Sequence, residues 1–389
     1  MDILTAPHLL LGRELVAPGW VAVDGARVQA AGPGEPPGAA TTSLPVGTLA
    51  PGLVDAQVNG GFGVDLHRAD LGGWRRLATA LPTTGVTAFV PTIVTAPADE
   101  QEQLLSRYRR GRAELDAAGG ARSLGVHVEG PFLSPTRRGA HPAEHLRDPD
   151  PAAVERLLDA GGGDLTYVTL APELPGGADA VERFVAAGVR VALGHTDASD
   201  AEVFAAADRG ATLVTHLFNG QPPLRSRAPG VVGAALADVR LTAGLIADGH
   251  HVAPTAIVVA FAAAPGRIML VTDATAALGM PPGRHELAGR VTVVAADGPP
   301  RLPDGTLAGA AVGLDAAVGV AVRAGVAPVT ALLAATRVPA DALGATEVGR
   351  IAPGAAADLV WLDERWRTRA TWVGGRRVHT DPAVSLPPA

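Results

Sequence analysis

Four residues that can bind a metal ion or transfer a proton stand at the ends of separate apolar segments: Glu129, His195, His216 and Asp273. Glu129 closes the apolar run 124–129, and a Gly-Pro pair then stops the predicted strand. A carboxylate at the end of a buried strand is costly unless a positive charge pairs with it. Two imidazoles and one carboxylate with an open position are a known arrangement for catalytic zinc. We therefore expect Glu129, His195 and His216 to hold one divalent metal ion. Asp273 would lie beside it as the proton-transfer group.

Each of these residues also has an ordinary structural explanation when it is taken alone. His195 and His216 could be loop histidines whose hydrogen bonds are satisfied locally. Glu129 could pair with an arginine, and Asp273 could cap the helix that follows it. Because four such residues stand at the ends of four apolar strands, a separate structural role for each of them is much less plausible than one shared site.

Metal-assisted hydrolysis is the reaction that this set of residues could perform. A bound ion lowers the pKa of water toward neutrality and polarises a carbonyl group. Asp273, outside the ligand set, could take the proton of the water and return it to the leaving group. The expected reaction class is the hydrolysis of an amide or a similar bond.

The segments that must position these residues alternate between strands and helices. The expected strands are 53–58, 86–94, 124–129, 167–171, 189–195, 213–217, 241–247 and 268–273, and expected helices include 98–118, 151–160, 178–187 and 199–209. The strands are apolar throughout, as expected when helices cover a parallel sheet. Eight strand–helix units predict an α/β protein with a (β/α)8 TIM-like barrel, whose strands all end at one face. A doubly wound open sheet is the main alternative, although no G-x-G-x-x-G motif follows any strand.

Both ends of the chain contain shorter strands separated by turns. These strands are expected within 19–28, where Asp24-Gly25 signals a hairpin, and at 357–362 and 371–378. We expect the two ends to form one discontinuous β-sandwich domain, residues 1–50 and 346–389, beside a barrel domain of residues 51–345. An insertion at 284–309, with a hairpin indicated by 291–294 and Asp304-Gly305, belongs to the barrel part.

The composition narrows the class of protein. Hydrophobic residues make up 47% and charged residues 18%, which favours a well-packed globule over a disordered chain. Because there is no cysteine, any metal site must use His, Asp or Glu. The net charge of −7 and the lack of a basic stripe argue against a nucleic-acid partner. No apolar run is long enough to span a bilayer, and residues 1–8 lack the pattern of a signal peptide, so we expect a cytoplasmic protein without a membrane partner.

Several motifs carry a family resemblance. Pro51-Gly52-Leu53-Val54-Asp55 and the segment 354–360 resemble the amidohydrolase superfamily. More narrowly, the segments 127–132, 193–196, 215–219, 247–251 and 270–274 are similar to the N-acetylglucosamine-6-phosphate deacetylase family, in the expected order over nearly the whole chain. The resemblance implies the same barrel with a small β-sandwich, and usually a homodimer. It also implies the metal ligands and the acid/base residue expected above.

The resemblance further implies how a substrate is held. Ala140 and His141 would meet the sugar or the carbonyl, and Arg227 would meet the phosphate, near or across a dimer interface. A guanidinium group suits phosphate oxygens bidentately, although a solvated loop is the ordinary explanation of this arginine. The other implied substrate contacts are Asn219, Gly220, His251, Leu307, Ala308 and Gly309.

Two departures from the related sequences affect the prediction. Many amidohydrolases carry His-x-His on the first strand, where this chain has Gln57 and Asn59. Amides are poor ligands beside imidazole, so we expect these two residues to be a remnant of a second-metal site and one ion to be held per subunit. Zinc is the expected ion, with Fe²⁺, Mn²⁺ and Co²⁺ also compatible. In the segment 308–312 related proteins often have serine, and its loss could alter the recognition of the acyl group.

The function implied by the resemblance is metal-dependent hydrolysis of the N-acetyl group of N-acetylglucosamine 6-phosphate, giving glucosamine 6-phosphate and acetate. The first alternative is a related amidohydrolase that acts on another N-acyl amino sugar or on a cyclic amide. A second alternative is a sugar-phosphate binding protein that has kept the cavity and lost catalysis. The presence of Asp273 together with all three expected ligands disfavours this second alternative.

Overall fold

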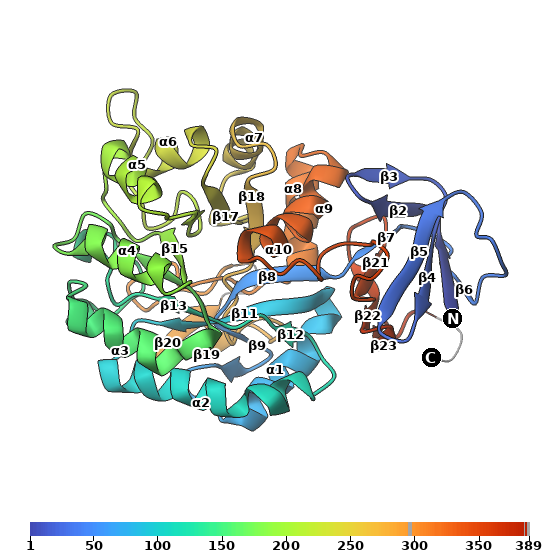
Figure 1. Ribbon diagram of the computed structural model, residues 1–389, viewed down its shortest axis with the longest axis horizontal. Coiled ribbons are helices and arrows are strands. Elements are labelled where there is room, and N and C mark those ends of the chain that lie inside the picture. The colour runs from blue at the N-terminus through green and yellow to red at the C-terminus, as the bar shows by residue number, and fades with distance from the viewer. Residues whose placement is uncertain (295–297, 385, 387–389) are drawn as a thin grey trace.

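A computed structural model describes residues 1–294, 298–384 and 386 (Figure 1). Residues 295–297 of the expected insertion, and residues 385 and 387–389 of the expected terminal domain, lie outside the described part. A barrel of parallel strands wrapped by helices forms the larger unit. Two mixed sheets, built from both ends of the chain, form a smaller unit beside it, and Figure 1 shows the N-terminus on that smaller unit.

The barrel strands form one parallel ring, with β12 (Arg122–Ser123) paired outside it to β11. The ring strands are β8 (Leu53–Val58), β11 (Val86–Val94), β13 (Val126–Glu129), β14 (Leu165–Leu170), β15 (Arg190–Leu193), β16 (Leu213–Val214), β17 (Thr242–Ile246) and β18 (Ile268–Val271). The ring closes between β18 and β8, where the Asp273 N–H donates to the Gln57 carbonyl at 3.0 Å. Every residue of β8, β11 and β13 is buried, which explains their uninterrupted apolar sequence. The predicted (β/α)8 barrel is confirmed.

Helices cover the outside of the ring. They are α1 (Leu71–Ala80), α2 (Ala98–Asp116), α3 (Pro151–Gly161), α4 (Gly177–Ala186), α5 (Asp200–Asp208), α6 (Gly230–Ala237), α7 (Pro254–Ala263), α8 (Leu314–Ala324), α9 (Pro328–Ala334) and α10 (Arg337–Leu343). Local signals fix several starts: Asp150 caps α3 ahead of Pro151, and Ser199 with Glu202 forms a capping box on α5. None of the described helices is both long and apolar enough to cross a membrane.

The two terminal sheets pack on a core of their own that includes Leu9, Val21, Leu49 and Trp361. One sheet has the order β5-β4-β1-β6 and the other the order β23-β22-β21-β7-β2-β3. The strands are β1 (Asp2–Ala6), β2 (His8–Leu11), β3 (Glu14–Val16), β4 (Gly19–Asp24), β5 (Arg27–Pro33), β6 (Thr42–Ser43), β7 (Thr48–Pro51), β21 (Leu359–Leu362), β22 (Thr368–Val373) and β23 (Arg376–Thr380). We propose that this unit comprises residues 1–50 and 346–389, and the barrel domain residues 51–345.

Two sequence predictions about hairpins were wrong in detail. The expected strand 371–378 is a hairpin of β22 and β23, because Gly374 and Gly375 both have positive φ and turn the chain between them. In the insertion, β20 (Arg290–Val294) pairs with β19 (Gly283–Leu287), whereas Asp304-Gly305 lies in a separate turn. Two further short strands, β9 (Gly60–Gly61) and β10 (Val64–Asp65), pair with each other near the barrel mouth.

An ion pair between a half-buried arginine and a buried aspartate joins the barrel to the terminal sheets. Arg122 donates to both carboxylate oxygens of Asp358, at 2.7 and 2.8 Å, and Asp358 is only 1% exposed. Replacing Arg122 with Met leaves this carboxylate buried without its counter-charge. We expect the apparent free energy of unfolding to fall by roughly 1–3 kcal/mol, measured by urea denaturation. Arg13→Met, at an exposed arginine in the β2–β3 turn, is the control, and an equal effect of both changes would contradict this role.

Candidate metal centre and its cavity

The four chemically active residues converge at the carboxyl ends of neighbouring barrel strands. Glu129 is the last residue of β13, and His195, His216 and Asp273 follow the ends of β15, β16 and β18 by two residues each. The three residues beyond the strands have positive φ values of 47°, 23° and 51°. Such left-handed backbone is uncommon for residues other than glycine and points to a local functional constraint.

Three electron-rich atoms meet at one point in this cluster. The Nε2 atoms of His195 and His216 are 3.0 Å apart, and they lie 3.3 and 3.0 Å from Oε1 of Glu129. The Nδ1 atoms face backbone carbonyls, that of Arg137 at 2.8 Å and that of Asn219 at 3.1 Å. A carbonyl only accepts, so each Nδ1 carries a proton and each neutral ring points the lone pair of Nε2 inward. The arrangement therefore needs a cation at its centre.

The electrostatics of the cluster also indicate a cation site. Burial opposes a charge on His216, but its hydrogen bond to Glu129 outweighs burial and raises its pKa. Burial likewise opposes ionisation of Glu129, and its hydrogen bonds with His195 and His216 outweigh this and hold its pKa well below the usual range. Without an ion, a proton thus supplies the positive charge, and a divalent ion would displace it. The residues present fit a divalent metal.

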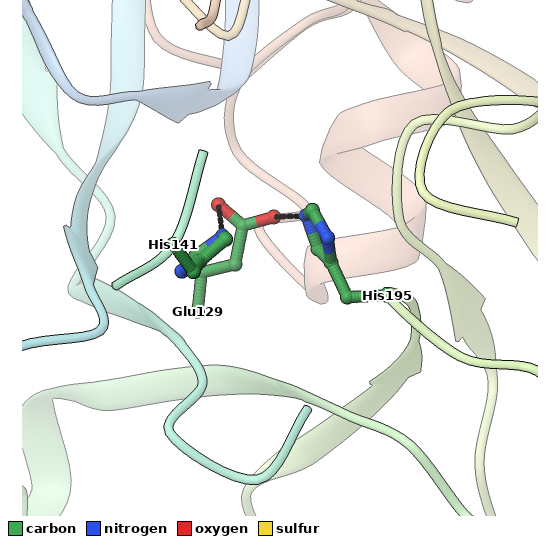
Figure 2. A group of neighbouring side chains, drawn as sticks. All are labelled: Glu129, His141 and His195. Atoms are coloured by element: carbon green, nitrogen blue, oxygen red, sulfur yellow. Dashed lines mark ion pairs between the residues drawn. The ribbon is translucent and has the colours of Figure 1, made fainter. Parts of the chain in front are cut away.

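His141 stands closer to this centre than its expected substrate role implied. Its Nε2 lies 3.9 Å from Oε2 of Glu129, on the opposite side of the carboxylate from His195 (Figure 2). The ligand atoms of Glu129, His141 and His195 all lie within 4.8 Å of one another, so these three also form a candidate metal group. Burial and the nearby His195 lower the pKa of His141 to about 3, which keeps its ring neutral. Because His141 lies on a loop, its proximity to Glu129 could not be predicted from the sequence.

Two amides bind the carboxylates from the side of the first strand. Gln57 Nε2 donates to Oε2 of Glu129 at 3.2 Å and to Oδ1 of Asp273 at 3.0 Å, and Asn59 Nδ2 donates to the same Oδ1 at 2.7 Å. The NH2 groups that face the carboxylates have no lone pair for a metal ion, so in this orientation the two amides bind the carboxylates and not a second ion. Burial, followed by the charge of Glu129, raises the pKa of Asp273 to about 6.

A second buried carboxylate supports the site and was not among the expected site residues. Asp55 accepts hydrogen bonds from the N–H of Thr272 at 3.1 Å and from its hydroxyl at 2.6 Å. It therefore ties β8 to β18 one residue before Asp273. Similarly, Asp248 accepts from Nδ1 of His251 at 2.7 Å and fixes the orientation of that ring. Both Asp55 and Asp248 could have been found in the sequence as aspartates within or just after an apolar strand.

A cavity of about 230 Å³ opens over the cluster. Most of the expected site residues line it: Asn59, Glu129, Ala140, His141, His195, His216, Asn219, Gly220, His251, Asp273, Leu307 and Gly309. Gln57 and Ala308 are buried and do not line the cavity, and Arg227 lies on an exposed loop away from it. Among the described residues of a single chain, the lining contains no lysine or arginine.

A model of the amidohydrolase family matches residues 48–378. The chain belongs to the amidohydrolase family. The N-acetylglucosamine-6-phosphate deacetylase of Bos taurus is 40% identical over 345 residues, covering 85% of this amidohydrolase and 83% of that relative. The N-acetylgalactosamine-6-phosphate deacetylase of Escherichia coli O157:H7 is 38% identical over 344 residues, covering 88% and 90%.

A solved structure gives the same grouping. An aspartate-to-alanine mutant of N-acetyl-D-glucosamine-6-phosphate deacetylase from Mycobacterium smegmatis, in complex with N-acetyl-D-glucosamine-6-phosphate, superposes on this amidohydrolase with a TM-score of 0.92. The identity is 37%, and the match covers 97% of this chain and 99% of that one. Within its family, this amidohydrolase groups with the N-acetylglucosamine-6-phosphate deacetylases.

Metal binding to this amidohydrolase can be tested without any substrate. We expect one equivalent of Zn²⁺ to raise the Tm of metal-free protein, since an ion at about 100 times its Kd adds about 2.7 kcal/mol of stability. Glu129→Gln removes the charged ligand and should abolish most of this shift. The control is His8→Gln, at an exposed histidine on β2. Undiminished zinc binding by Glu129→Gln would show that the ion is held elsewhere.

Proposed function

We propose that the chain hydrolyses the N-acetyl group of N-acetylglucosamine 6-phosphate, giving glucosamine 6-phosphate and acetate. The convergence of Glu129, His195 and His216 beside the buried carboxylate of Asp273 carries this proposal. The proposed ligand set is these first three residues, because His216 approaches the carboxylate to 3.0 Å and His141 only to 3.9 Å. The relatives named above provide the substrate class.

A divalent ion bound by this set would polarise the carbonyl of the acetyl group and lower the pKa of a water molecule. Zinc is the ion we propose, since two imidazoles and a carboxylate suit it well. His141, neutral and adjacent to Glu129, is placed to contact the carbonyl oxygen. The amide pair Gln57 and Asn59 leaves room for one ion per subunit.

Asp273 is the proposed general base and acid. Its Oδ1 is fixed by Gln57 and Asn59, while no described residue hydrogen-bonds its Oδ2. The free Oδ2 can accept the proton of the attacking water as the water oxygen bonds to the carbonyl carbon. The C–N bond then breaks, and Asp273 passes the proton to the departing amine. One carboxylate thus performs both transfers.

Within one described chain, no lysine or arginine lines the cavity in which the substrate would bind. Because no lysine or arginine lines the cavity, we propose that the chain works as a homodimer in which Arg227 of the neighbouring copy meets the phosphate. Asn219, Gly220 and His251 would hold the sugar, and Leu307 and Gly309 would contact the acetyl group, with Ala308 packed behind them. We place the reaction in the cytoplasm, where phosphorylated sugars are retained.

Removing the proton-transfer group should stop turnover and leave metal binding in place. We expect Asp273→Asn to lower kcat by a factor of about 10²–10⁴. In the wild type, Asp273 must be ionised to accept a proton, so kcat/KM should fall as the pH drops through its pKa. That pKa is raised to about 6 without an ion and is lowered by a cation, so the acid limb belongs at or below pH 6. An acid limb well above pH 6 would assign the base to another group.

The proposed substrate is tested by acetate release from N-acetylglucosamine 6-phosphate, N-acetylgalactosamine 6-phosphate and unphosphorylated N-acetylglucosamine. We expect a strong preference for the first. Arg227→Ala should raise KM for the phosphorylated sugars at least about tenfold and leave the unphosphorylated sugar unaffected. Arg225→Ala, two residues away on the same exposed loop, is the matched control. Equal rates on phosphorylated and unphosphorylated sugar would overturn the proposed substrate, and a preference for the galactose epimer would reassign it.

A further inference from the structure

A second cavity adjoins the proposed reaction cavity and has no role in the mechanism above. Its volume is about 290 Å³, and we call it the annex. The two cavities share four lining residues, Val94, Ala140, His141 and Leu287. His141 therefore stands between the annex and the metal centre, with its Nε2 3.9 Å from Glu129. The annex therefore opens beside the carboxylate that we expect to hold the metal ion.

Two arginines line the annex, the half-buried Arg290 and the exposed Arg68. Arg290, on β20, donates a hydrogen bond to the carbonyl of Ala140, which fixes its guanidinium beside the shared wall. Arg68 lies across the turn of the β19–β20 hairpin, where a Cβ on Gly289 would come within 2.3 Å of its Nη2. A side chain at position 289 would require this guanidinium to move. No described residue forms a hydrogen bond or ion pair with the Arg68 side chain.

The remaining walls are small apolar groups and a few ionisable ones. Ala96, Pro97 and Ala288 contribute apolar surface, and Glu100, Glu144 and His145 are the other ionisable residues. Glu100 faces Nδ1 of His67 at 3.9 Å, and this contact is the largest cause that lowers its pKa. The charges of Arg68 and His145 lower the pKa of Glu100 further, so this carboxylate also interacts with Arg68. The annex combines two guanidinium groups with two carboxylates and a small apolar surface. Guanidinium groups beside an apolar surface are the chemistry that recognises a short-chain carboxylate.

We propose that the annex binds the acetate released by the reaction and forms its exit route. This inference rests on the proposed function. When the water oxygen bonds to the acyl carbon and the C–N bond breaks, the electron pair of that bond goes to the nitrogen. Both protons of the water go to the amine, one of them through Asp273, so the amine leaves as an ammonium group. The acyl group becomes a carboxylate with one negative charge. That charge appears next to Glu129, which repels it, while the sugar product still fills the other side of the cavity. The arginines beyond His141 provide the nearest favourable destination.

The phosphate of the substrate is the other oxyanion that two arginines could bind. The geometry favours acetate, because the phosphate at C6 and the acetyl group at C2 lie on opposite sides of the sugar ring. With the acetyl group at the metal centre, the phosphate is directed away from His141. The annex would then receive the smaller anion.

Product inhibition by added acetate tests the proposal. We expect Arg290→Met and Arg68→Met each to raise the inhibition constant of acetate about tenfold, the effect of losing a charge-assisted hydrogen bond. The KM for N-acetylglucosamine 6-phosphate should stay within about twofold. Arg284→Met is the matched control, since Arg284 is exposed on the same hairpin and does not line the annex. Arg290→Lys, which keeps the charge, should restore part of the acetate affinity.

The possible results distinguish acetate from the substrate phosphate as the anion bound in the annex. They also distinguish failure of the annex proposal from failure of the proposed function. Unchanged acetate inhibition in both methionine variants overturns the annex as an acetate site. A raised KM for phosphorylated but not for unphosphorylated sugar overturns it too and assigns the arginines to the phosphate. If the wild type releases no acetate from any N-acetyl sugar, the proposed function fails. Direct titration with ¹³C-labelled acetate then decides the annex alone, since weaker binding by the arginine variants supports it and equal binding refutes it.

Discussion

The site depends on three electron-pair donor atoms that face one another, namely Nε2 of His195, Nε2 of His216 and Oε1 of Glu129. His195, His216 and Glu129 approach to within about 3 Å, and backbone carbonyls fix both imidazole rings so that neither can turn away. The arrangement is unfavourable unless a positive charge occupies the centre. Everything around it maintains this condition, from the left-handed backbone after each strand to the amides that hold the adjacent carboxylates. The metal chemistry follows because the fold holds these electron-pair donor atoms close together.

The second organising feature is the closure of the barrel beneath the site. Asp55 binds both the backbone and the hydroxyl of Thr272, so the first and the last strand of the ring meet through a buried carboxylate. This contact sets the position of Asp273 relative to Gln57 on the facing strand. Asp55 is fully shielded from solvent at this junction, and its burial raises its pKa to about 7. The same contact therefore closes the barrel and positions Asp273, the proposed base.

Much of this could be predicted from the sequence, because parallel strands in a barrel all end at the same face. That rule brings Glu129, His195, His216 and Asp273 together without any knowledge of distances. The proximity of His141 could not be predicted in the same way, since a loop position depends on tertiary packing. The hairpin at Gly374-Gly375 was missed because one apolar-rich run concealed two strands. The annex was missed because it is formed by segments distant in sequence, with Arg68 and Arg290 more than 200 residues apart.

The smaller unit also has a consequence for how the protein is made. Strand β7, at residues 48–51, lies between β2 and β21 in one sheet, and β21 follows it by some 300 residues. The first strands to leave the ribosome therefore have an unpaired edge until nearly the whole barrel has been synthesised. Contacts of such long range form slowly, and exposed strand edges favour aggregation. The barrel segment can begin to fold while this edge is still unpaired. The last step of folding would then be the addition of β21–β23 to the sheet that the first residues began.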